Sequence, residues 1–381
     1  MRLLFCIDRY HPSRGGAEAY LRDLCAALHA RGHEISIAAL EAEEDGNADL
    51  IRIPAPRFPR LAREIVFAVK VRRLKRRSSF DRTLGFRHVL DADLFQPHEG
   101  LFIDSMRGSL GPSSSRPFIL KLLFLKKLLS LKNLFFLYTD WALFRNNPKL
   151  KVAALSCRMA SAIEFRYACY QPRTTVIPNG VDIKKFYAEP DPGRREALRI
   201  RLALPLKGRL LLFVGHNFRL KGLIEAIRGV AEYGRQGKNA LLIVVGRGKT
   251  KPYQRLIQRI GMEGRVFFLG EQAEMRGLYA ASDLLLHPTY YDPCSLVVLE
   301  ALGAGLPVIT SRFNGAAELL QGTEAGCIIE DPRDTNALAN ALTEILDSGQ
   351  YETFRKNAAM VGASNAFEQH VQRMESWIMG T

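Results

Sequence analysis

The stretch DPCSLVVLEALGAGLPVIT, from Asp292 to Thr310, combines a short apolar helix with the strand that follows it. Asp292 precedes the helix, and Glu300 is expected at its front after seven intervening residues. Free backbone amides at a helix start attract phosphate, and a carboxylate one or two turns further in can bind sugar hydroxyls. One element of this kind could therefore hold both halves of a sugar nucleotide.

Short apolar runs alternate with helical stretches around this segment, throughout the second half of the chain. They have the length and the continuous apolar character of strands that are buried in a parallel sheet. The predicted strands are 209–216, 240–246, 265–270, 283–289, 307–310 and 326–330. Because β and α segments alternate, we predict a parallel sheet with helices on both faces.

The first half of the chain follows the same plan. An apolar strand leads through a glycine-containing loop into a helix, and a second strand follows that helix. The predicted strands here are 2–7, 34–40, 94–96 and 152–155, and the predicted helix is 17–33. The fold class that we predict is α/β, with two doubly wound, Rossmann-like domains.

The length of 381 residues also favours two domains over a single core. Prolines and a glycine punctuate the segment 171–182, where we place the boundary. The N-terminal domain would comprise residues 1–172, and the C-terminal domain would comprise residues 173–361. The last helical stretch, about 351–379, follows the final strand and needs a surface to cover.

The charge of the chain is strongly positive, with a formal net of +15. Residues 1–180 contain 29 Lys and Arg against 17 Asp and Glu, a net of +12, and the remainder has a net of only +3. The basic field of the first half attracts nucleic acid, anionic lipid or a phosphorylated substrate, and charge alone does not choose among them.

From the cysteines and the N-terminal residues we expect a cytoplasmic protein. The six cysteines have no Cys-x-x-Cys spacing, so neither a metal knuckle nor a redox pair is predicted, and reduced thiols are expected. The first apolar run is too short for a signal peptide and ends at Asp8. Lysines interrupt the most apolar region, 118–144, so we expect no transmembrane helix.

Glycine-rich turns follow two of the predicted strands. Gly15 and Gly16 lie between the first strand and its helix, and the turn GRGK at Gly246–Lys249 follows strand 240–246. Glycines let a backbone approach a ligand closely, and open α/β sheets bind ligands at the carboxyl ends of their strands. Each pattern is equally typical of an ordinary tight turn.

Two cations lie on the loop after the predicted strand 209–216. Arg219 and Lys221 precede the next helix, where they could neutralise a diphosphate leaving group. The alternative is a solvated surface pair, which is the usual environment of such residues.

Three further polar residues are candidates for a functional site. His98 follows the predicted strand 94–96, although a lone histidine more often makes a structural hydrogen bond. Asp292, which precedes a proline, is equally typical of a helix N-cap. Glu300 lies on an apolar helix, where an acid needs a partner.

A group of basic residues in the first half of the chain is the last candidate for a functional surface. It consists of KVRRLKRR, Lys70–Arg77, and the lysines of the apolar region 118–144. It could be a solvated helix face beside core residues, or a surface that docks on anionic lipid with leucine and phenylalanine entering the interface. Nucleic acid is less favoured, because no recognised binding motif accompanies the charge.

Several motifs together resemble the retaining glycosyltransferases of family 4, and within them the lipopolysaccharide-core glucosyltransferases of the WaaG type. The motifs are Gly-Gly-x-Glu at Gly15–Glu18, VIPNGVD, FRLKG, HPTYYDPCSLVVLEALGAGLPVIT and FNGAAEL. Two departures stand out: Asp292 replaces the usual Glu, and His216 stands where Arg is common. The resemblance implies the GT-B architecture, two Rossmann-like domains facing across a cleft, with a terminal helix at about 362–381 crossing back onto the first domain.

The resemblance also implies roles for individual residues. It places His98 near the reacting carbon of the donor sugar, Asp292 beside that sugar and Glu300 on the nucleotide ribose. Together with Arg219 and Lys221, the first two form the predicted catalytic set. The implied nucleotide-sugar-binding set is Gly15, Gly16, Gly246, Cys294, Ser295, Leu296, Val297 and Glu300.

These expectations describe a hexosyltransferase that uses a nucleotide-diphosphate sugar, with UDP-glucose as the expected donor. The acceptor would be a lipid-linked or lipopolysaccharide-core saccharide, and anomeric configuration would be retained. We expect no metal and no cofactor, because Lys221, Arg219 and helix amides would carry the leaving-group charge. The protein would be cytoplasmic and peripheral on the inner face of the cell membrane. The alternative is a GT-B protein without catalysis that serves as a membrane-docked nucleotide-sugar or glycan binding module.

Overall fold

The structure is a computed structural model that describes residues 1–12, 15–56, 59–77, 79–111, 116–170, 173–187 and 191–380. Its contacts divide the chain into two compact units. The first unit comprises Met1–Pro178 with Gln369–Thr381, and the second comprises Asn179–Glu368. Pro172, where the sequence places the end of the N-terminal domain, lies outside the described residues.

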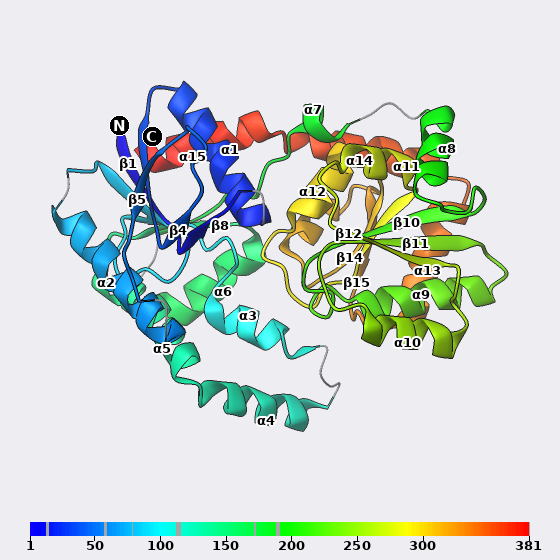
Figure 1. Cartoon of the computed structure of the whole chain (residues 1–381), viewed down its shortest axis with the longest axis horizontal. Helices are drawn as coiled ribbons and strands as arrows, with labels where there is room; N and C mark the ends of the chain where they lie inside the picture. Colours follow the sequence, from blue (N-terminus) through cyan, green and yellow to red (C-terminus); the bar gives the residue numbers. More distant parts are fainter. Residues whose placement is uncertain are drawn as a thin grey trace. The chain divides into compact units, whose positions relative to one another are not determined.

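The first unit is built on a seven-stranded parallel sheet, of which strands β1, β5 and β8 are labelled in Figure 1. The order of its strands is β5-β3-β1-β6-β7-β8-β9. Its strands are β1 (Arg2–Cys6), β3 (Glu34–Ala39), β5 (Asp49–Arg52), β6 (Arg82–Gly85), β7 (Leu94–Phe95), β8 (Lys151–Ala154) and β9 (Arg173–Val176), and β2 (Arg9–Tyr10) pairs separately with β4 (Glu41–Ala42). Its helices are α1 (Gly16–Ala30), α2 (Arg60–Arg77), α3 (Phe102–Gly108), α4 (Pro117–Leu128), α5 (Leu131–Asn146), α6 (Cys157–Tyr167), the 3-10 helix η2 (Ala168–Tyr170) and the C-terminal α15 (Phe367–Met379).

The second unit contains a six-stranded parallel sheet in the order β12-β11-β10-β13-β14-β15. Its strands are β10 (Arg209–Val214), β11 (Ala240–Val245), β12 (Val266–Gly270), β13 (Leu284–His287), β14 (Val308–Ser311) and β15 (Gly326–Ile329). Its helices are α7 (Ile183–Phe186), α8 (Pro192–Arg201), α9 (Leu223–Arg235), α10 (Lys251–Ile260), α11 (Arg276–Ala281), α12 (Leu296–Gly303), the 3-10 helix η3 (Gly315–Leu320), α13 (Thr335–Asp347) and α14 (Tyr351–Ser364).

The core of the second unit explains why these segments form a parallel sheet. All six residues of β11 are buried, as are the four of β13, and continuous apolar strands of this kind must be covered on both faces. One buried cluster joins β10 and β11 to α9 and α13. Gly229 of α9 allows close packing, because a Cβ there would lie 2.8 Å from the Cβ of Leu338 on α13. The predicted α/β class with two Rossmann-like units is confirmed.

The strand order places a topological switch point in each unit. The chain leaves β10 for β11 on one side and later returns to β13 on the other side of β10. In the first unit, β1 is likewise flanked by β3 and β6. Ligands of open α/β sheets bind outside the carboxyl ends of strands at such a point. In the second unit, the loops after β10 and β13 are therefore the first place to look for a site.

Helix α15 completes the first unit although it follows the second unit in the sequence. His370 is fully buried, and its Nε2 lies 2.9 Å from the hydroxyl of Tyr20 on α1. Glu375 accepts from Arg31 at 2.5 Å and lies 2.9 Å from Nε2 of His33. Helix α15 is therefore joined to α1 by the buried Tyr20–His370 contact and to the segment after α1 by partly buried contacts of Glu375.

Candidate active site

A cation and a carboxylate meet at the switch point of the second unit. Lys221 lies on the loop after β10, and Asp292 lies on the loop after β13. The Nζ atom of Lys221 is 2.5 Å from Oδ2 of Asp292, and both side chains are mostly buried, at 21% and 12% exposure. Gly222 lets the loop that carries Lys221 pass close to the loop after β13. Its φ is +79°, and a Cβ there would overlap the carbonyl oxygen of Pro288.

The electrostatics of Asp292 are governed by its neighbours. Burial alone raises the pKa of this carboxyl, but Lys221 and His287 outweigh burial and hold the pKa well below its usual value. His287 is fully buried at the end of β13, and its Nε2 lies 3.9 Å from Oδ2 of Asp292. Burial lowers the pKa of His287, so its ring is neutral near pH 7 and Asp292 is ionised.

The turn from Asp292 to Ser295 is held by buried amides. Oδ1 of Asn314 accepts from the backbone N–H of Ser295 at 3.2 Å and from that of Ala316 at 3.1 Å. Nδ2 of Asn179 donates to the carbonyl of Cys294 at 2.9 Å. Two other segments of the chain thus fix the backbone at the start of α12.

Helix α12 begins later than the sequence predicts. Ser295 is its N-cap residue and Leu296 its first residue, so the alternative interpretation of Asp292 as a helix N-cap does not hold. Glu300 is the fifth of eight helical residues and not at the helix front, which is also a correction. The reason is that Asp292 forms an isolated β-bridge with Asn314, which keeps its backbone extended. Leu296 and Val297 therefore supply first-turn amides, which have no acceptor within a helix.

Glu300 has a partner that the sequence did not indicate. The hydroxyl of Tyr279 on α11 donates to Oε2 of Glu300 at 2.7 Å, and Tyr279 is only 1% exposed. Burial raises the pKa of Glu300, while Tyr279 and Lys185 lower it in part. One carboxylate oxygen is thus bonded to Tyr279 while the side chain stays partly exposed.

The remaining predicted residues of the second unit lie around the same sheet edge. Gly246 follows β11 with a φ of +128°, and a Cβ there would overlap the carbonyl oxygen of Gly215 after β10. Arg219 is exposed on the loop that carries Lys221. His216 accepts from the backbone N–H of Arg247 at 3.3 Å, so it links the loops after β10 and β11.

Three predicted residues lie in the first unit. Gly15 is the N-cap of α1, and Gly16 is its first residue. His98 follows β7, and its ring stacks on Tyr20 with centroids 4.6 Å apart. Tyr20 in turn bonds His370, so His98 lies on a buried polar cluster at the carboxyl end of the sheet.

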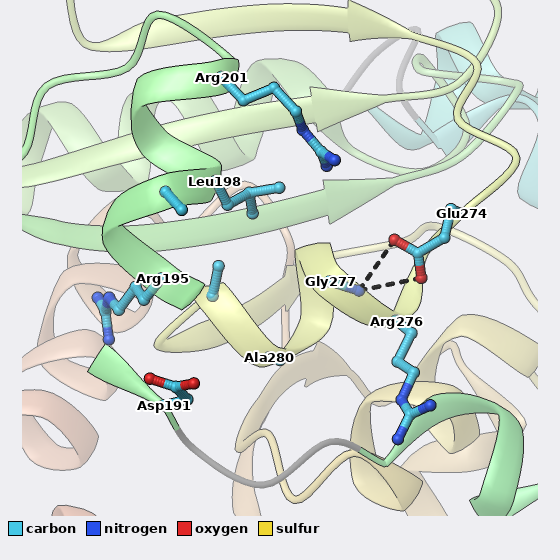
Figure 2. Close-up of a pocket in the computed structure, with 10 residues that line it drawn as sticks. Asp191, Arg195, Leu198, Arg201, Glu274, Arg276, Gly277 and Ala280 are labelled. Carbon is cyan, nitrogen blue, oxygen red and sulfur yellow. Dashed lines mark hydrogen bonds between the residues drawn. The ribbon is translucent and has the colours of Figure 1, made fainter. Parts of the chain in front are cut away.

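A separate pocket of about 610 Å³ lies between α8 and α11, and Figure 2 shows the residues that line it. Three of them are arginines, Arg195, Arg201 and Arg276. Arg195 pairs with Asp283. Figure 2 shows Glu274, which accepts from the backbone N–H of Gly277. The lining includes none of the predicted site residues. We therefore place the candidate site at the sheet edge and not in this pocket.

Sequence reasoning missed four residues of the site. Asn179 lies in the motif VIPNGVD, His287 in HPTYYD and Asn314 in FNGAAEL, so three had a signal as members of recognised motifs without an assigned role. Tyr279 had no such signal, because its contact with Glu300 joins residues on two helices.

The chain matches known protein families and known proteins along most of its length. Residues 14–83 match Glycosyltransferase Family 4, and residues 194–361 match the Glycosyl transferases group 1. The chain is 27% identical over 351 residues to lipopolysaccharide glucosyltransferase WaaG of Escherichia coli, covering 91% of this chain and 90% of that protein. It is 30% identical to a D-inositol 3-phosphate glycosyltransferase of Corynebacterium jeikeium, over 45% of this chain and 43% of that one.

Solved structures show the same architecture. The crystal structure of WaaG superposes with a TM-score of 0.82 at 25% identity, and the match covers 100% of both chains. Anabaena HepE, solved with UDP-glucose, superposes with a TM-score of 0.74 at 20% identity, again over 100% of both chains. These neighbours have the GT-B fold.

Proposed function

Because this chain is a glycosyltransferase, with a family 4 domain in its first half and a group 1 domain in its second, we propose that it transfers glucose from UDP-glucose to a lipopolysaccharide-core or other lipid-linked saccharide. The similarity to WaaG over nine-tenths of both chains supports the sugar and the acceptor class. We further propose that the transfer retains anomeric configuration.

The observation that carries this proposal is the Lys221–Asp292 pair beside the first turn of α12. A diphosphate at this sheet edge would draw the Lys221 ammonium and accept hydrogen bonds from the amides of Leu296 and Val297. Glu300, one turn further along α12, would take the ribose hydroxyls. Arg219 on the same loop is exposed and would add a second cation. These groups would stabilise the charge that develops on departing UDP.

Retention is proposed to occur on one face of the sugar. Asp292 is bonded to Lys221 and so serves as a partner for a cation and not as a free nucleophile. We therefore favour departure of UDP and attack of the acceptor on the same side, through an oxocarbenium-like transition state. His98 is proposed to contact the donor sugar near the reacting carbon.

Metal independence is part of the proposal. Lys221, Arg219 and the α12 amides would supply the positive charge that a divalent cation supplies elsewhere. Across the described ranges, no group of three or more His, Cys, Asp or Glu residues is arranged to hold a metal ion. Transfer that persists in a chelator would support the proposal, and transfer restored only by added Mg²⁺ would contradict it.

Docking on anionic lipid is also proposed, and helix α4 is its main support. Large apolar side chains on and after α4 are exposed: Phe118 (77%), Leu122 (59%), Leu125 (50%), Leu129 (82%) and Leu131 (71%). Lys121, Lys126 and Lys132 are exposed among them. In Figure 1, α4 lies at the outer edge of the first unit, away from its sheet. Basic and apolar groups interleaved in this way suit an interfacial helix that binds anionic headgroups.

The basic run on α2 contributes less than its sequence suggests. Arg73, Arg76 and Arg77 are exposed. Lys75, in contrast, is 18% exposed and lies 2.7 Å from Asp91 and 2.9 Å from Asp93. None of the described helices is both long and apolar enough to cross a bilayer.

The test is a donor panel. UDP-, GDP- and ADP-sugars are offered with and without a lipopolysaccharide-core acceptor, while nucleoside diphosphate release is followed and the anomer of the product is assigned by NMR. UDP release from UDP-glucose with an α-linked product supports the proposal. A preference for another base or a β-linked product contradicts it. Binding of UDP-glucose without release or transfer would favour a catalytically inactive binding module.

A further inference from the structure

His287 lies beside two residues of the candidate site, Asp292 and Ser295. It is 0% exposed, and its Nε2 is 3.9 Å from Oδ2 of Asp292 and 3.5 Å from Oγ of Ser295. The carbonyl of His287 accepts from Oγ1 of Thr310 at 2.8 Å, and its ring lies 6.1 Å from that of Phe213. The ring is thus held on the end of β13 and reaches the turn that precedes α12.

Both Lys221 and His287 face the same oxygen of Asp292, Oδ2. Lys221 contacts Oδ2 at 2.5 Å, while His287 stands 3.9 Å away from the same atom. If Lys221 turned to a diphosphate, Asp292 would be left as a mostly buried carboxylate without a cation. A buried charge that loses its partner is strongly destabilised. The cost would oppose donor binding unless another group replaced Lys221.

His287 is placed to make that replacement. Its Nε2 needs to move less than about 1.2 Å to reach hydrogen-bond distance from Oδ2. Its neutral ring carries one N–H, and a donor at Nε2 would serve the carboxylate without adding a buried positive charge. The charged side chains around the ring are Asp292 and Lys221.

We propose that His287 is a positioning residue that takes over Oδ2 of Asp292 when Lys221 turns to the donor diphosphate. The exchange is one of hydrogen-bond partners, and no covalent bond forms or breaks. It rests on the proposed function, because the diphosphate is what draws Lys221 away. An ordinary core histidine, in contrast, would affect folding stability and leave diphosphate affinity unchanged.

The experiment is a double-mutant cycle on UDP affinity, measured by calorimetry. His287→Gln places an amide N–H near the position of Nε2, and His287→Asn stops short of it. Each is combined with Asp292→Asn, which removes the carboxylate. We expect His287→Asn to weaken UDP binding about tenfold, an effect of the size measured between residues of one hydrogen-bond network. His287→Gln should retain most of the affinity for UDP. In the Asp292→Asn background, neither substitution should matter.

Controls separate this exchange from a loss of folding. His33→Asn removes a second buried histidine that faces a carboxylate, Glu375 in the first unit, and should add independently to Asp292→Asn. Thermal unfolding confirms that each variant is folded. If His287→Asn does not fold, the cycle is measured with His287→Gln alone. Equal losses in both Asp292 backgrounds, or equal behaviour of the Gln and Asn variants, would overturn the proposal.

Inorganic diphosphate, titrated in parallel, distinguishes failure of this inference from failure of the proposed donor. Binding of diphosphate but not UDP to the unmodified protein would refute UDP as the donor nucleotide, and the cycle would still be read with diphosphate. Absence of binding for both would overturn the partner exchange as well.

Discussion

Nζ of Lys221 and Oδ2 of Asp292 are 2.5 Å apart, although the two residues belong to loops that are separated by 71 positions in the sequence. The loops follow β10 and β13, which are neighbours in the sheet. Residues that look like two independent candidates in the sequence thus form one charged unit. Every prediction for either residue must account for the other.

Lys221→Ala should lower the transfer rate by about 10²–10³-fold, as loss of one stabiliser of a developing anion does. The variant also leaves Asp292 without its cation, so the free energy of unfolding should fall by roughly 1.5–3 kcal/mol. Lys238→Ala is the matched control, since Lys238 pairs with Asp347 at 3.3 Å in the same unit. Steady-state kinetics with saturating UDP-glucose measure the effect. Near-normal turnover would remove Lys221 from the mechanism.

The Asp292 carboxyl should contribute to stability across an unusually wide pH range. Its pKa is lowered in the folded state, so its stabilisation is present above the unfolded value near 3.8 and lost only as the pH falls below it. Denaturant unfolding between pH 3 and pH 7 compares the protein with Asp292→Asn. The difference between them should stay constant down to about pH 5 and change only below that. If the two proteins had equal free energies of unfolding at neutral pH, the ionised Asp292 carboxyl would not stabilise the fold and the prediction would be wrong.

Glu300→Ala should weaken UDP binding by roughly 1.5–3 kcal/mol, the contribution of a hydrogen bond to a charged group. Tyr279→Phe should weaken it by less, because the carboxylate remains and only its orienting partner is lost. Tyr233→Phe removes a similar hydroxyl–carboxylate bond, 3.0 Å long, to Asp347 and should leave UDP affinity unchanged. Calorimetry with UDP decides, and equal affinity for all three variants would exclude a ribose role.

Asp140 should make the stability of the protein fall as the pH rises. Burial raises its pKa from 3.8 to about 7, and the backbone N–H of Phe102 donates to its Oδ2 at 2.9 Å. Between these values the unfolded chain loses a proton that the folded chain keeps, so stability decreases by roughly 4 kcal/mol across the window. Asp140→Asn should flatten this slope. Denaturant unfolding between pH 4 and pH 8 tests it, and parallel curves for both proteins would contradict it.

Vesicles that contain anionic lipid should retain the protein at low salt, while neutral vesicles should not. Replacing Leu122, Leu125 and Leu129 by Ser should weaken co-sedimentation by several kcal/mol, at about 0.8 kcal/mol for each buried CH₂. Ile200→Ser with Leu206→Ser is the control, since these side chains are also exposed (63% and 55%) but lie in the second unit. High salt should reproduce the loss. A protein that stays in the supernatant would refute docking.

The sequence predicts the sheets well because their strands are apolar and short. The six predicted strands of the second unit correspond to β10–β15, with ends that differ by one or two residues. In the first unit β5, β6 and β9 were missed, since DLIR, RTLG and RTTV contain few apolar residues and are identified only by their neighbours in the sheet.

The candidate site is predictable only in part, for a related reason. Motifs identify residues one loop at a time, so Lys221, Asp292 and Glu300 could be chosen from local patterns. Their partners could not, because Tyr279 and Lys221 are brought to Glu300 and Asp292 by strand order and helix packing. The start of α12 was misplaced since the β-bridge from Asp292 to Asn314 joins positions 22 residues apart.

Helix α15 has a consequence for how the protein is made. Ribosomes deliver the chain from its N-terminus, and domains generally fold as they emerge. The second unit, Asn179–Glu368, is synthesised before Gln369–Thr381, which the first unit needs for its contacts from Tyr20 and Arg31. The unit that emerges first is therefore the last to be finished. Its exposed α1 surface is expected to need protection, by chaperones or by delay, until α15 has left the ribosome.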